Sequence, residues 1–263
     1  MPNRLFIVSL FLIVSVSASC QTVSQNIDEE DSPPPEPEEG FQPIFDGETL
    51  GGWEGDSTYW RVENGSLVGE ITPETLLESN SFIIWQGGTP ANFELKTEFR
   101  ITENGNSGIN YRSERIDTIP YALRGYQADI DGKNRYTGQN YEEKKRTTLA
   151  YRGEQATISS QDNPDESGSL RANVERNAWT HRDVTASLGE SDSLKTNIKQ
   201  GDWNEMHLIV NGNRLQHYVN GVLMSDVTDD DTINRSMQGQ LGVQVHVGPP
   251  MQVEYRNIRL KQL

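Results

Sequence analysis

Cysteine is almost absent from this chain, whose 263 residues include a single one, Cys20. One cysteine cannot form an internal disulfide, and it cannot supply a cysteine-rich zinc or iron–sulfur site. Because Cys20 ends an apolar leader, we do not expect it to act as a catalytic nucleophile. The folded part of the chain must therefore be stabilised, and must work, without thiol chemistry.

Basic residues are also scarce. The chain has 39 acidic and 23 basic side chains, which give a formal net charge of −16. Proteins that bind nucleic acids neutralise phosphates with basic patches, and anionic membrane surfaces attract basic segments. We therefore expect no nucleic-acid partner and no electrostatic adhesion to a membrane.

Long apolar segments are missing as well. The longest apolar run covers residues 5–16, which is shorter than the roughly 20 residues that a membrane-spanning helix needs. This run follows Arg4 and precedes the small residues 17–19, an order typical of a secretory signal peptide. The sequence therefore predicts export of the protein.

The position of Cys20 suggests what happens after export. A cysteine directly after the small residues resembles a bacterial lipobox, in which the cysteine is acylated and becomes the mature N-terminus. We therefore expect residues 1–20 to be a lipoprotein signal peptide, with the protein lipid-anchored to the cell envelope, in the periplasm or at the cell surface. This anchor would be its only membrane contact. The alternative is an ordinary secreted protein with a free cysteine.

The next segment is acidic and rich in proline. Residues 21–40 contain seven acids, no basic residue and four prolines. Such a composition buries too little apolar surface to offset the entropy of ordering, so we expect a disordered tether. Residues 41–263 then remain for a single domain, because about 220 residues are ample for one large core.

Strand patterns dominate this domain. Residues 93–101 alternate apolar and polar side chains with period two, which is typical of a half-buried strand. Two Asn-Gly pairs, Asn211-Gly212 and Asn220-Gly221, join three further strands at residues 206–210, 214–219 and 222–224. Asn-Gly favours a tight hairpin because both positions tolerate positive φ.

The last strands predict one apolar and one polar face. Leu and Val occupy alternate positions in residues 241–247, which leaves Gln244 and His246 together on the other face. With a closing strand at residues 253–260 and no long amphipathic helix, the pattern predicts an all-β fold, an antiparallel jelly-roll sandwich. One sheet of such a sandwich often holds ligand on a concave face, and His217, Gln244 and His246 suit that face.

Segments in order across residues 41–263 resemble the 3-keto-disaccharide hydrolase domains. They are Phe41-Gln42-Pro43-Ile44-Phe45-Asp46-Gly47 continuing to Trp53, Trp60-Arg61-Val62-Glu63-Asn64-Gly65, residues 93–100, Gly105-Asn106-Ser107-Gly108-Ile109 with Arg112, Gly201-Asp202-Trp203-Asn204, Asn220-Gly221 and residues 255–260. Each segment is weak alone, but together they are specific. The resemblance implies a concanavalin A-like jelly roll of the lectin and glucanase type.

The resemblance also implies an activity, as a 3-keto-glucoside 1,2-lyase and 3-keto-2-hydroxyglucal hydratase acting on a glycoside or oligosaccharide. A ketone at carbon 3 acidifies the proton on carbon 2, so a base can remove it. The resulting enolate can expel the aglycone from carbon 1, and water can then add back. Such a site needs a base with a tuned pKa, a cation or metal for the enolate oxygen, and an acid for the leaving group.

Candidate substrate-binding residues lie in the polar stretch at residues 125–131. Gln127, Asp129 and Asp131 are two residues apart and would share one face of a strand. The resemblance implies that this position lines the site. The alternative is an exposed edge strand.

Candidate catalytic residues follow at residues 141–146. We expect Glu142 or Glu143 to supply the catalytic carboxylate, with Tyr141 and Arg146 binding substrate beside it. A solvated loop with local ion pairs is the alternative for this segment.

Arginine and histidine complete the candidate site. Arg112 is a candidate catalytic cation because its planar guanidinium suits a carbonyl, enolate or carboxylate; a structural salt bridge, for example to Glu114, is the alternative. His246 is the favoured catalytic histidine, while His217 and Gln244 are expected to bind substrate. A strand histidine that only donates a hydrogen bond is the alternative for both.

A divalent metal is left open as a cofactor. Asp129, Asp131, Glu142 and His246 could together hold calcium or a transition ion, although no spacing is diagnostic of one metal. Trp203 is expected in the core rather than as a sugar platform.

Two other functions are compatible with such a fold. A non-catalytic, surface-tethered carbohydrate-binding module would tolerate the loss of Glu142 or His246. An ordinary β-glucanase would need Glu-x-Asp-x-x-Glu on one strand, and residues 127–132 lack both glutamates. The glucanase is therefore disfavoured, and the binding module is kept as the alternative.

Overall fold

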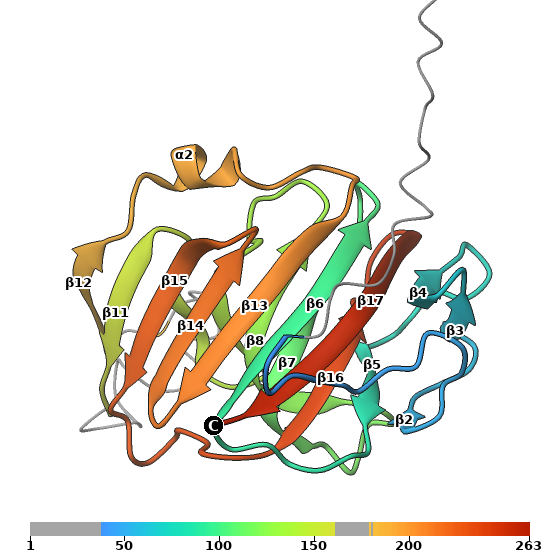
Figure 1. Ribbon diagram of the computed structural model, residues 1–263, viewed down its shortest axis with the longest axis horizontal. Helices are drawn as coiled ribbons and strands as arrows, with labels where there is room; N and C mark the ends of the chain where they lie inside the picture. Colours follow the sequence, from blue (N-terminus) through green and yellow to red (C-terminus); the bar gives the residue numbers. More distant parts are fainter. Residues whose placement is uncertain (1–37, 161–178, 180) are drawn as a thin grey trace, which may run out of the picture. The chain divides into compact units, whose positions relative to one another are not determined.

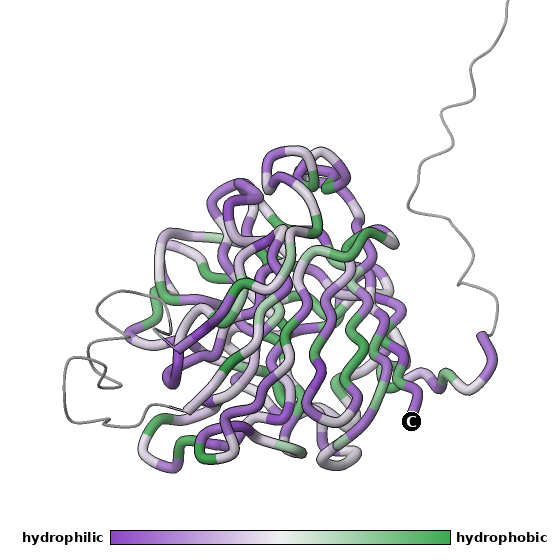
Figure 2. Tube along the Cα trace, turned by 90° about the vertical axis from the view of Figure 1, so that its left-hand side faces the viewer, coloured by the Kyte–Doolittle hydropathy of each residue, from purple (hydrophilic) through white to green (hydrophobic). Residues whose placement is uncertain are grey.

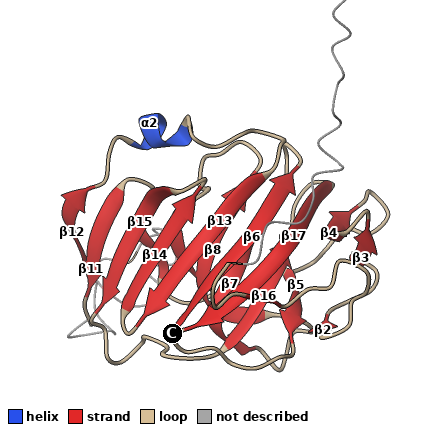
Figure 3. Ribbon diagram, in the orientation of Figure 1, coloured by secondary structure: helices blue, strands red, loops and turns tan. Residues whose placement is uncertain are grey.

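Two β-sheets packed face to face make up the domain in the computed structural model, which describes residues 38–160, 179 and 181–263 (Figure 1). The predicted signal peptide with Cys20, and residues 21–37 of the predicted tether, lie outside these residues. The described residues form one short helix, α2 (Ser191–Lys195), and 17 strands. Figure 3 shows that the strands make up most of the domain. No helix in the described ranges is long and apolar enough to cross a membrane.

The larger sheet, sheet A, has ten strands. In spatial order they are β12 (Arg182–Ser187), β11 (Glu154–Ile158), β15 (Val222–Asp229), β14 (Arg214–Val219), β13 (Asn204–Asn211), β6 (Phe93–Ile101), β17 (Met251–Gln262), β4 (Ser66–Ile71) and β3 (Trp60–Glu63), with β1 (Gln42–Pro43) also paired to β17. Figure 1 shows this sheet in front.

The smaller sheet, sheet B, has seven strands and lies behind sheet A in Figure 1. In spatial order they are β10 (Thr147–Ala150), β9 (Asn140–Glu143), β8 (Leu123–Asp131), β7 (Asn106–Arg115), β16 (Gln240–Val245), β5 (Ser81–Trp85) and β2 (Trp53–Glu54). All pairs within this sheet are antiparallel.

Both predicted hairpins are present. β13 pairs antiparallel with β14, and β14 with β15 across Asn220-Gly221. Asn220 and Gly221 have φ angles of 50° and 77°, the left-handed region that this tight turn requires. The expected antiparallel sandwich is confirmed with one exception, because β11 runs parallel to its neighbour β15.

The core fills the space between the sheets with side chains from alternate strand positions. On β6 the expected alternation is confirmed, with Phe93, Leu95, Thr97 and Phe99 buried and the residues at the positions between these half-buried. Met206 and Leu208 of β13 pack into the same cluster. Figure 2 shows hydrophobic and hydrophilic positions alternating along the strands. Each fully buried side chain of this size contributes about 1.5–3 kcal/mol.

Trp203 does not lie in the core, contrary to the expectation. It is half-buried on the outer face of sheet A, where the guanidinium carbons of Arg256 and Arg100 lie 4.0 and 4.8 Å from its ring centroid. Arg256 also pairs with Glu98 at 2.7 Å, and Arg100 with Glu254 at 2.9 Å. The aromatic face attracts both guanidinium groups, so the tryptophan stays at the surface.

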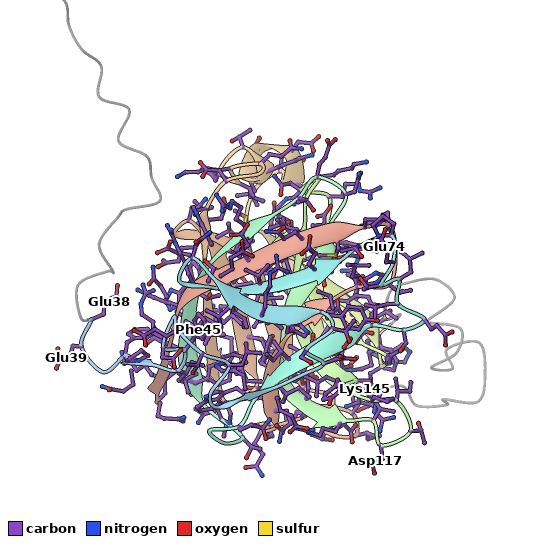
Figure 4. All side chains as sticks on the ribbon, turned by 90° about the vertical axis from the view of Figure 1, so that its right-hand side faces the viewer. Glu38, Glu39, Phe45, Glu74, Asp117 and Lys145 are labelled. Atoms are coloured by element: carbon purple, nitrogen blue, oxygen red, sulfur yellow. The ribbon has the colours of Figure 1, made fainter. Side chains whose placement is uncertain are left out.

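The last residues of the predicted tether contact the outer face of sheet A. The Glu38 carboxylate lies 2.7 Å from Lys96 Nζ, and the Phe41 ring lies 5.1 Å from the same ammonium and 5.7 Å from that of Lys261. Figure 4 shows Glu38 on the opposite side of the domain from Lys145, which follows β9 of sheet B. The chain therefore enters the domain on the sheet A side.

A buried ion cluster ties the two sheets together. Arg146, in the turn between β9 and β10, donates from Nε to Glu142 at 2.6 Å. Its terminal nitrogens reach the Asp229 carboxylate at 2.6 and 3.0 Å and Asp231 at 3.3 Å, and Tyr126 Oη donates to Asp229 at 2.5 Å. All four charged side chains are at most 1% exposed. A single guanidinium thus holds three carboxylates in the core.

We predict that Arg146→Met destabilises the protein strongly. Removing the cation leaves buried carboxylates without their partner, which costs about 3–5 kcal/mol of the free energy of unfolding. Arg124→Met is the matched control, since Arg124 pairs with Glu114 at 2.9 Å in an exposed ion pair and should cost no more than about 1 kcal/mol. Urea denaturation measures both. Equal losses in the two variants would contradict the cluster's structural role.

Candidate functional site

Sheet B turns every second residue away from the core. On β8, Tyr126, Ala128 and Ile130 belong to the hydrophobic core, whereas Gln127 and Asp129 line a cavity on the outer face. Successive residues of a strand point to opposite faces, so one strand serves both purposes. The site is therefore built on the face of sheet B that looks away from sheet A.

This cavity, here called the carboxylate cavity, has a volume of about 180 Å³. Its lining comes from β7, β8, β9, the loop between β8 and β9, and the residue after β16: Asn106, Gln127, Asp129, Tyr136, Gln139, Tyr141, Glu143 and His246. Most of these side chains are polar, and two of them are carboxylates. The arrangement suits a small, hydroxyl-rich ligand better than an apolar one.

A layer of amides forms the floor of the carboxylate cavity. Gln127 crosses over Gly108 of β7, where an added Cβ would lie 2.6 Å from the glutamine side chain. Beyond that strand its Oε1 accepts a hydrogen bond of 3.2 Å from Gln244 Nε2 on β16. Gly108 lies within β7 rather than in a turn, and its lack of a side chain leaves room for this contact.

Asp129 is held by two amide side chains, and no cation pairs with it among the described residues. Its two carboxylate oxygens accept hydrogen bonds from Gln127 Nε2 at 2.6 Å and Gln139 Nε2 at 2.5 Å. Burial raises the pKa of Asp129 to about 7, and the charge of Glu143 acts in the same direction. The two amide donors favour the ionised form but do not cancel the cost of burial. Asp129 can therefore gain and lose a proton near neutral pH.

Asn80 links the second carboxylate to the histidine. Its Nδ2 donates to Glu143 Oε1 at 3.0 Å, and its Oδ1 accepts from the Val247 amide at 2.9 Å. His246 Nδ1 in turn lies 2.6 Å from the Val247 carbonyl. A carbonyl only accepts, so Nδ1 carries a proton and Nε2 is the nitrogen left for a ligand. Burial also raises the pKa of Glu143.

A second cavity of about 280 Å³, here called the adjoining cavity, lies beside the first. The two share Asn106, Tyr136 and His246 as lining residues. Asp131 also lines the adjoining cavity, but its carboxylate accepts hydrogen bonds from the backbone amides of the loop that follows β8. Asp131 thus shares a face with Asp129 as expected, and it is engaged in shaping the loop.

The structure brings only some of the expected site residues together. Those that line or underlie the carboxylate cavity are Gln127, Asp129, Tyr141, Glu143, Gln244 and His246. Glu142 and Arg146 are fully buried in the ion cluster of the core instead. The expectation that both residues lie in the site is therefore wrong. Side chains alternate along β9, so Glu142 points inward and its neighbour Glu143 points outward. Arg146, in the turn after β9, pairs with Glu142 in the core.

Arg112 is also placed away from the cavity. It lies where the register between β7 and β8 shifts, with a φ of 45°, and its guanidinium donates to the carbonyls of Ala91 and Gly212 at 2.5–2.8 Å. Neither the expected enolate contact nor the alternative salt bridge to Glu114 is found, since Glu114 pairs with Arg124. Arg112 instead satisfies buried backbone carbonyls next to sheet B.

His217 supports the site from the core side. Its Nδ1 lies 3.2 Å from the Gln139 carbonyl, which fixes Nε2 as the acceptor from Tyr111 Oη at 2.8 Å. Burial lowers the pKa of His217 to about 4, so the ring is neutral. His217 does not line the carboxylate cavity as expected, but it holds the backbone of Gln139, whose side chain binds Asp129.

The four residues considered as a metal site are not brought together. Asp129 and His246 line the carboxylate cavity, whereas Glu142 points into the core and Asp131 binds backbone amides. Among the residues placed by the structure, no group of three or more His, Cys, Asp or Glu side chains is arranged to hold a metal ion.

Asn80, Gln139 and Tyr136 were missed by the sequence analysis. Asn80 precedes β5, and the other two lie in the loop between β8 and β9. Neither strand periodicity nor any motif marks them, because their roles depend on contacts between distant segments. Tyr136 alone carried a signal, as an aromatic residue in a polar loop.

The comparisons with known proteins agree with this fold. A family model described as the 3-keto-alpha-glucoside-1,2-lyase-like domain matches residues 40–261. The solved structure of a candidate glycosyl hydrolase from Parabacteroides distasonis ATCC 8503 is 19% identical, covers 86% of this chain and 94% of its own, and has a TM-score of 0.52. A second structure from that organism is 14% identical over 85% and 99%, with a TM-score of 0.51. No curated protein matches this chain.

We predict that Asp129→Asn makes the stability of the protein less dependent on pH. The carboxyl titrates near its usual 3.8 in the unfolded chain and near 7 in the folded one. The wild type should therefore lose stability as pH rises from about 4 to about 7, by up to about 4 kcal/mol. The asparagine side chain does not titrate, so the variant should be the more stable protein at pH 8.

Urea denaturation at pH 4 and pH 8 tests this. Asp117→Asn, at an exposed carboxyl labelled in Figure 4, is the control and should follow the wild type at both values. A wild-type-to-variant difference that is the same at pH 4 and pH 8 would show that the Asp129 carboxyl is not perturbed.

Proposed function

Because this chain belongs to the 3-keto-alpha-glucoside-1,2-lyase-like domain family, we propose that it cleaves glycosides already oxidised at carbon 3. The reaction removes the proton at carbon 2 and expels the aglycone from carbon 1, and addition of water can complete a net hydrolysis. The observation that carries the proposal is a pair of buried carboxylates with raised pKa values in one cavity, next to a histidine.

The first step needs a base that is ionised near neutral pH and still basic enough to accept a proton from carbon 2. Asp129, with a pKa of about 7, suits this task, since a base works best when its pKa is near the working pH. It takes the proton from carbon 2, and the electron pair of that bond moves onto the carbon 3 oxygen. Glu143 raises the pKa of Asp129 by its charge and serves as a second proton acceptor in the same cavity.

The enolate oxygen needs hydrogen-bond donors. Tyr141 lines the carboxylate cavity, and burial raises the pKa of its hydroxyl, so it remains protonated and able to donate. The Asn106 amide is the second donor in that lining. In this proposal these neutral donors stabilise the enolate oxygen, a role that was expected of Arg112.

The second step breaks the bond between carbon 1 and the aglycone oxygen. The enolate electrons return to form the carbon 3 ketone and a double bond between carbons 1 and 2. His246 enters this step with both ring nitrogens protonated, gives the Nε2 proton to the departing oxygen and keeps the proton on Nδ1. Nδ1 is bound to the Val247 carbonyl at 2.6 Å, so Nε2 is the nitrogen available. In the hydration that follows, water supplies hydroxyl to carbon 1 and gives its proton to His246 Nε2, and protonated Asp129 returns its proton to carbon 2.

The alternative is a carbohydrate-binding module without catalysis. The carboxylate cavity would also suit sugar hydroxyls, and Tyr136, 39% exposed, offers an aromatic contact. Such a module has no need of a carboxyl whose pKa lies near neutrality, and the cost of burying Asp129 favours the enzyme.

We predict that the chain releases 4-nitrophenol from 4-nitrophenyl 3-keto-glucoside but not from its unoxidised parent, because only the ketone acidifies carbon 2. Asp129→Asn should lower kcat/KM by about 10²- to 10⁴-fold. In the wild type, kcat/KM should rise with pH up to about 7, where the base becomes deprotonated.

Asp117→Asn serves again as the control and should retain the wild-type rate. Binding of the keto compound without release would favour the binding module. Release from the unoxidised parent would overturn the mechanism, because cleavage would then not depend on the ketone.

We also predict that the effect of His246→Gln depends on the leaving group. Methanol is a poor leaving group and needs a proton, so the variant should cleave methyl 3-keto-glucoside about 10²–10⁴ times more slowly. 4-Nitrophenolate leaves unaided, and its release should slow by less than about tenfold. Equal losses of kcat for both substrates would mean that His246 does not protonate the leaving oxygen.

A further inference from the structure

The two amides that hold Asp129 are fixed to different degrees. Gln127 donates from Nε2 to Asp129 Oδ1 at 2.6 Å, and its Oε1 accepts from Gln244 Nε2 at 3.2 Å. Gln127 and Gln244 are 3% and 0% exposed, and Gln127 packs closely over Gly108. Gln127 could turn its amide over only if the Gln244 amide turned with it. The Nε2 group of Gln127 therefore stays directed at Asp129.

The Gln139 amide is not fixed in this way. Its Nε2 donates to Asp129 Oδ2 at 2.5 Å, its Oε1 accepts no hydrogen bond from the described residues, and the side chain lines the carboxylate cavity. Its backbone, by contrast, is held on both sides. The N–H donates to the Tyr136 carbonyl at 2.9 Å, and the carbonyl lies 3.3 Å from the Asp129 amide and 3.2 Å from His217 Nδ1. The terminal torsion of glutamine has no sharp staggered wells, so the amide can turn while the backbone stays in place.

The two protonation states of Asp129 need different partners. An ionised carboxylate only accepts hydrogen bonds, whereas a carboxylic acid accepts at its carbonyl oxygen and donates from its hydroxyl. Two amide NH₂ groups suit the ionised form. In the acid, Oδ1 can still accept from Gln127, but a hydroxyl at Oδ2 would face the NH₂ group of Gln139. If the Gln139 amide turns over, its Oε1 accepts that hydroxyl.

We propose that Gln139 is a positioning residue that places the proton of Asp129 on Oδ2, by turning Nε2 toward the carboxylate and Oε1 toward the carboxylic acid. On the premise of the proposed function, Oδ2 takes the proton of carbon 2. The C–H bond breaks, the O–H bond forms, and the electron pair moves onto the carbon 3 oxygen. Gln139 then turns and holds this proton on Asp129 until hydration returns it to carbon 2.

Other titratable groups face Asp129, so its own titration must be separated from theirs. They come from its own strand, from β9, from the loop between β8 and β9, and from the residue after β16: Asp131, Tyr141, Glu143, Tyr136 and His246. Asp129→Asn makes this separation, because the new side chain does not titrate. Its carbonyl and NH₂ groups also match the C=O and O–H of the acid, so Gln139 should be turned in this variant at every pH.

The experiment measures hydrogen exchange of glutamine side-chain NH₂ groups with water, by NMR on the full-length chain at pH 5 and pH 9. Each exchange rate is divided by that of Gln262, which is exposed. For Gln139 this ratio should be about tenfold higher at pH 5 than at pH 9, because its NH₂ group loses the hydrogen bond to a charged carboxylate and turns into the cavity. For Gln127 the ratio should stay low at both values. Gln139→Met and Gln127→Met identify the two signals.

Asp129→Asn is the control for this measurement. In this variant the Gln139 ratio should be high at both pH 5 and pH 9. A Gln139 ratio that is low at both values in the wild type would overturn the proposal, since the amide would then be a fixed donor. A rise for Gln127 in place of Gln139 would also overturn it, because the proton would then lie on Oδ1.

The pH profile of kcat/KM gives a second test, with 4-nitrophenyl 3-keto-glucoside as substrate. Gln127→Met removes a bond that is strongest to the ionised form, so the pH at which kcat/KM levels off should rise by about one unit. Gln139→Met removes a partner of both forms, so this pH should move by less than about half a unit while kcat falls by about tenfold. Equal upward shifts of the profile in both variants would contradict the dual role of Gln139.

Gln216→Met is the matched control for the pH profiles. Gln216 also donates to a carboxylate, that of Asp226 at 3.3 Å, but it lies on β14 of sheet A, and this variant should keep the wild-type profile. The exchange measurement needs no cleavage, so the two proposals fail separately. No release of 4-nitrophenol by the wild type would overturn the proposed function, whereas release with an unchanged Gln139 exchange ratio would overturn only the role of Gln139.

Discussion

The pleat of sheet B is the constraint on which the rest of the structure depends. Glu142 and Glu143 are neighbours in β9, yet one is bound to Arg146 in the core and the other lines the carboxylate cavity. Tyr126 and Gln127 divide in the same way on β8. Because side chains alternate across a strand, one thin layer of backbone separates a charged structural cluster from a charged functional site. A register slip of one residue would exchange the two sets.

The positions of the arginines decide how the carboxylates behave. Arg146 pairs with the acids of the core, and Arg112 donates hydrogen bonds to backbone carbonyls. Neither guanidinium therefore reaches the carboxylate cavity. Among the residues that the structure describes, the two acids of that cavity, Asp129 and Glu143, accept side-chain hydrogen bonds from amides alone. Asp129 is therefore buried with its charge uncompensated, which raises its pKa to about 7. Burying the Asp129 carboxylate lowers the free energy of unfolding, and the same burial makes this group a proton acceptor suited to neutral pH.

The two outer faces of the sandwich are differently built. Sheet A carries exposed and half-buried ion pairs across β6, β13 and β17, such as Arg256 with Glu98 and Arg259 with Glu205. Each such pair contributes little to the free energy of unfolding, but together they cover the outer face of the sheet with charged groups. The chain also enters the domain on this side, at Glu38 and Phe41. The carboxylate cavity lies on the other side of the sandwich, on the outer face of sheet B.

The sequence by itself determined the all-β class, the two hairpins, the alternation of β6 and the family, because these depend on local periodicity, on turn residues and on motifs read in order. It also pointed to Asp129, Gln244 and His246 through the period-two pattern, and to Glu143 through the resemblance to the family. Only the tertiary structure decided which face of β9 looks inward, and so which glutamate meets Arg146. It likewise brought Asn80 and Gln139 to the carboxylates. Those contacts join segments far apart in the chain, and local patterns carry no information about which distant side chains will meet.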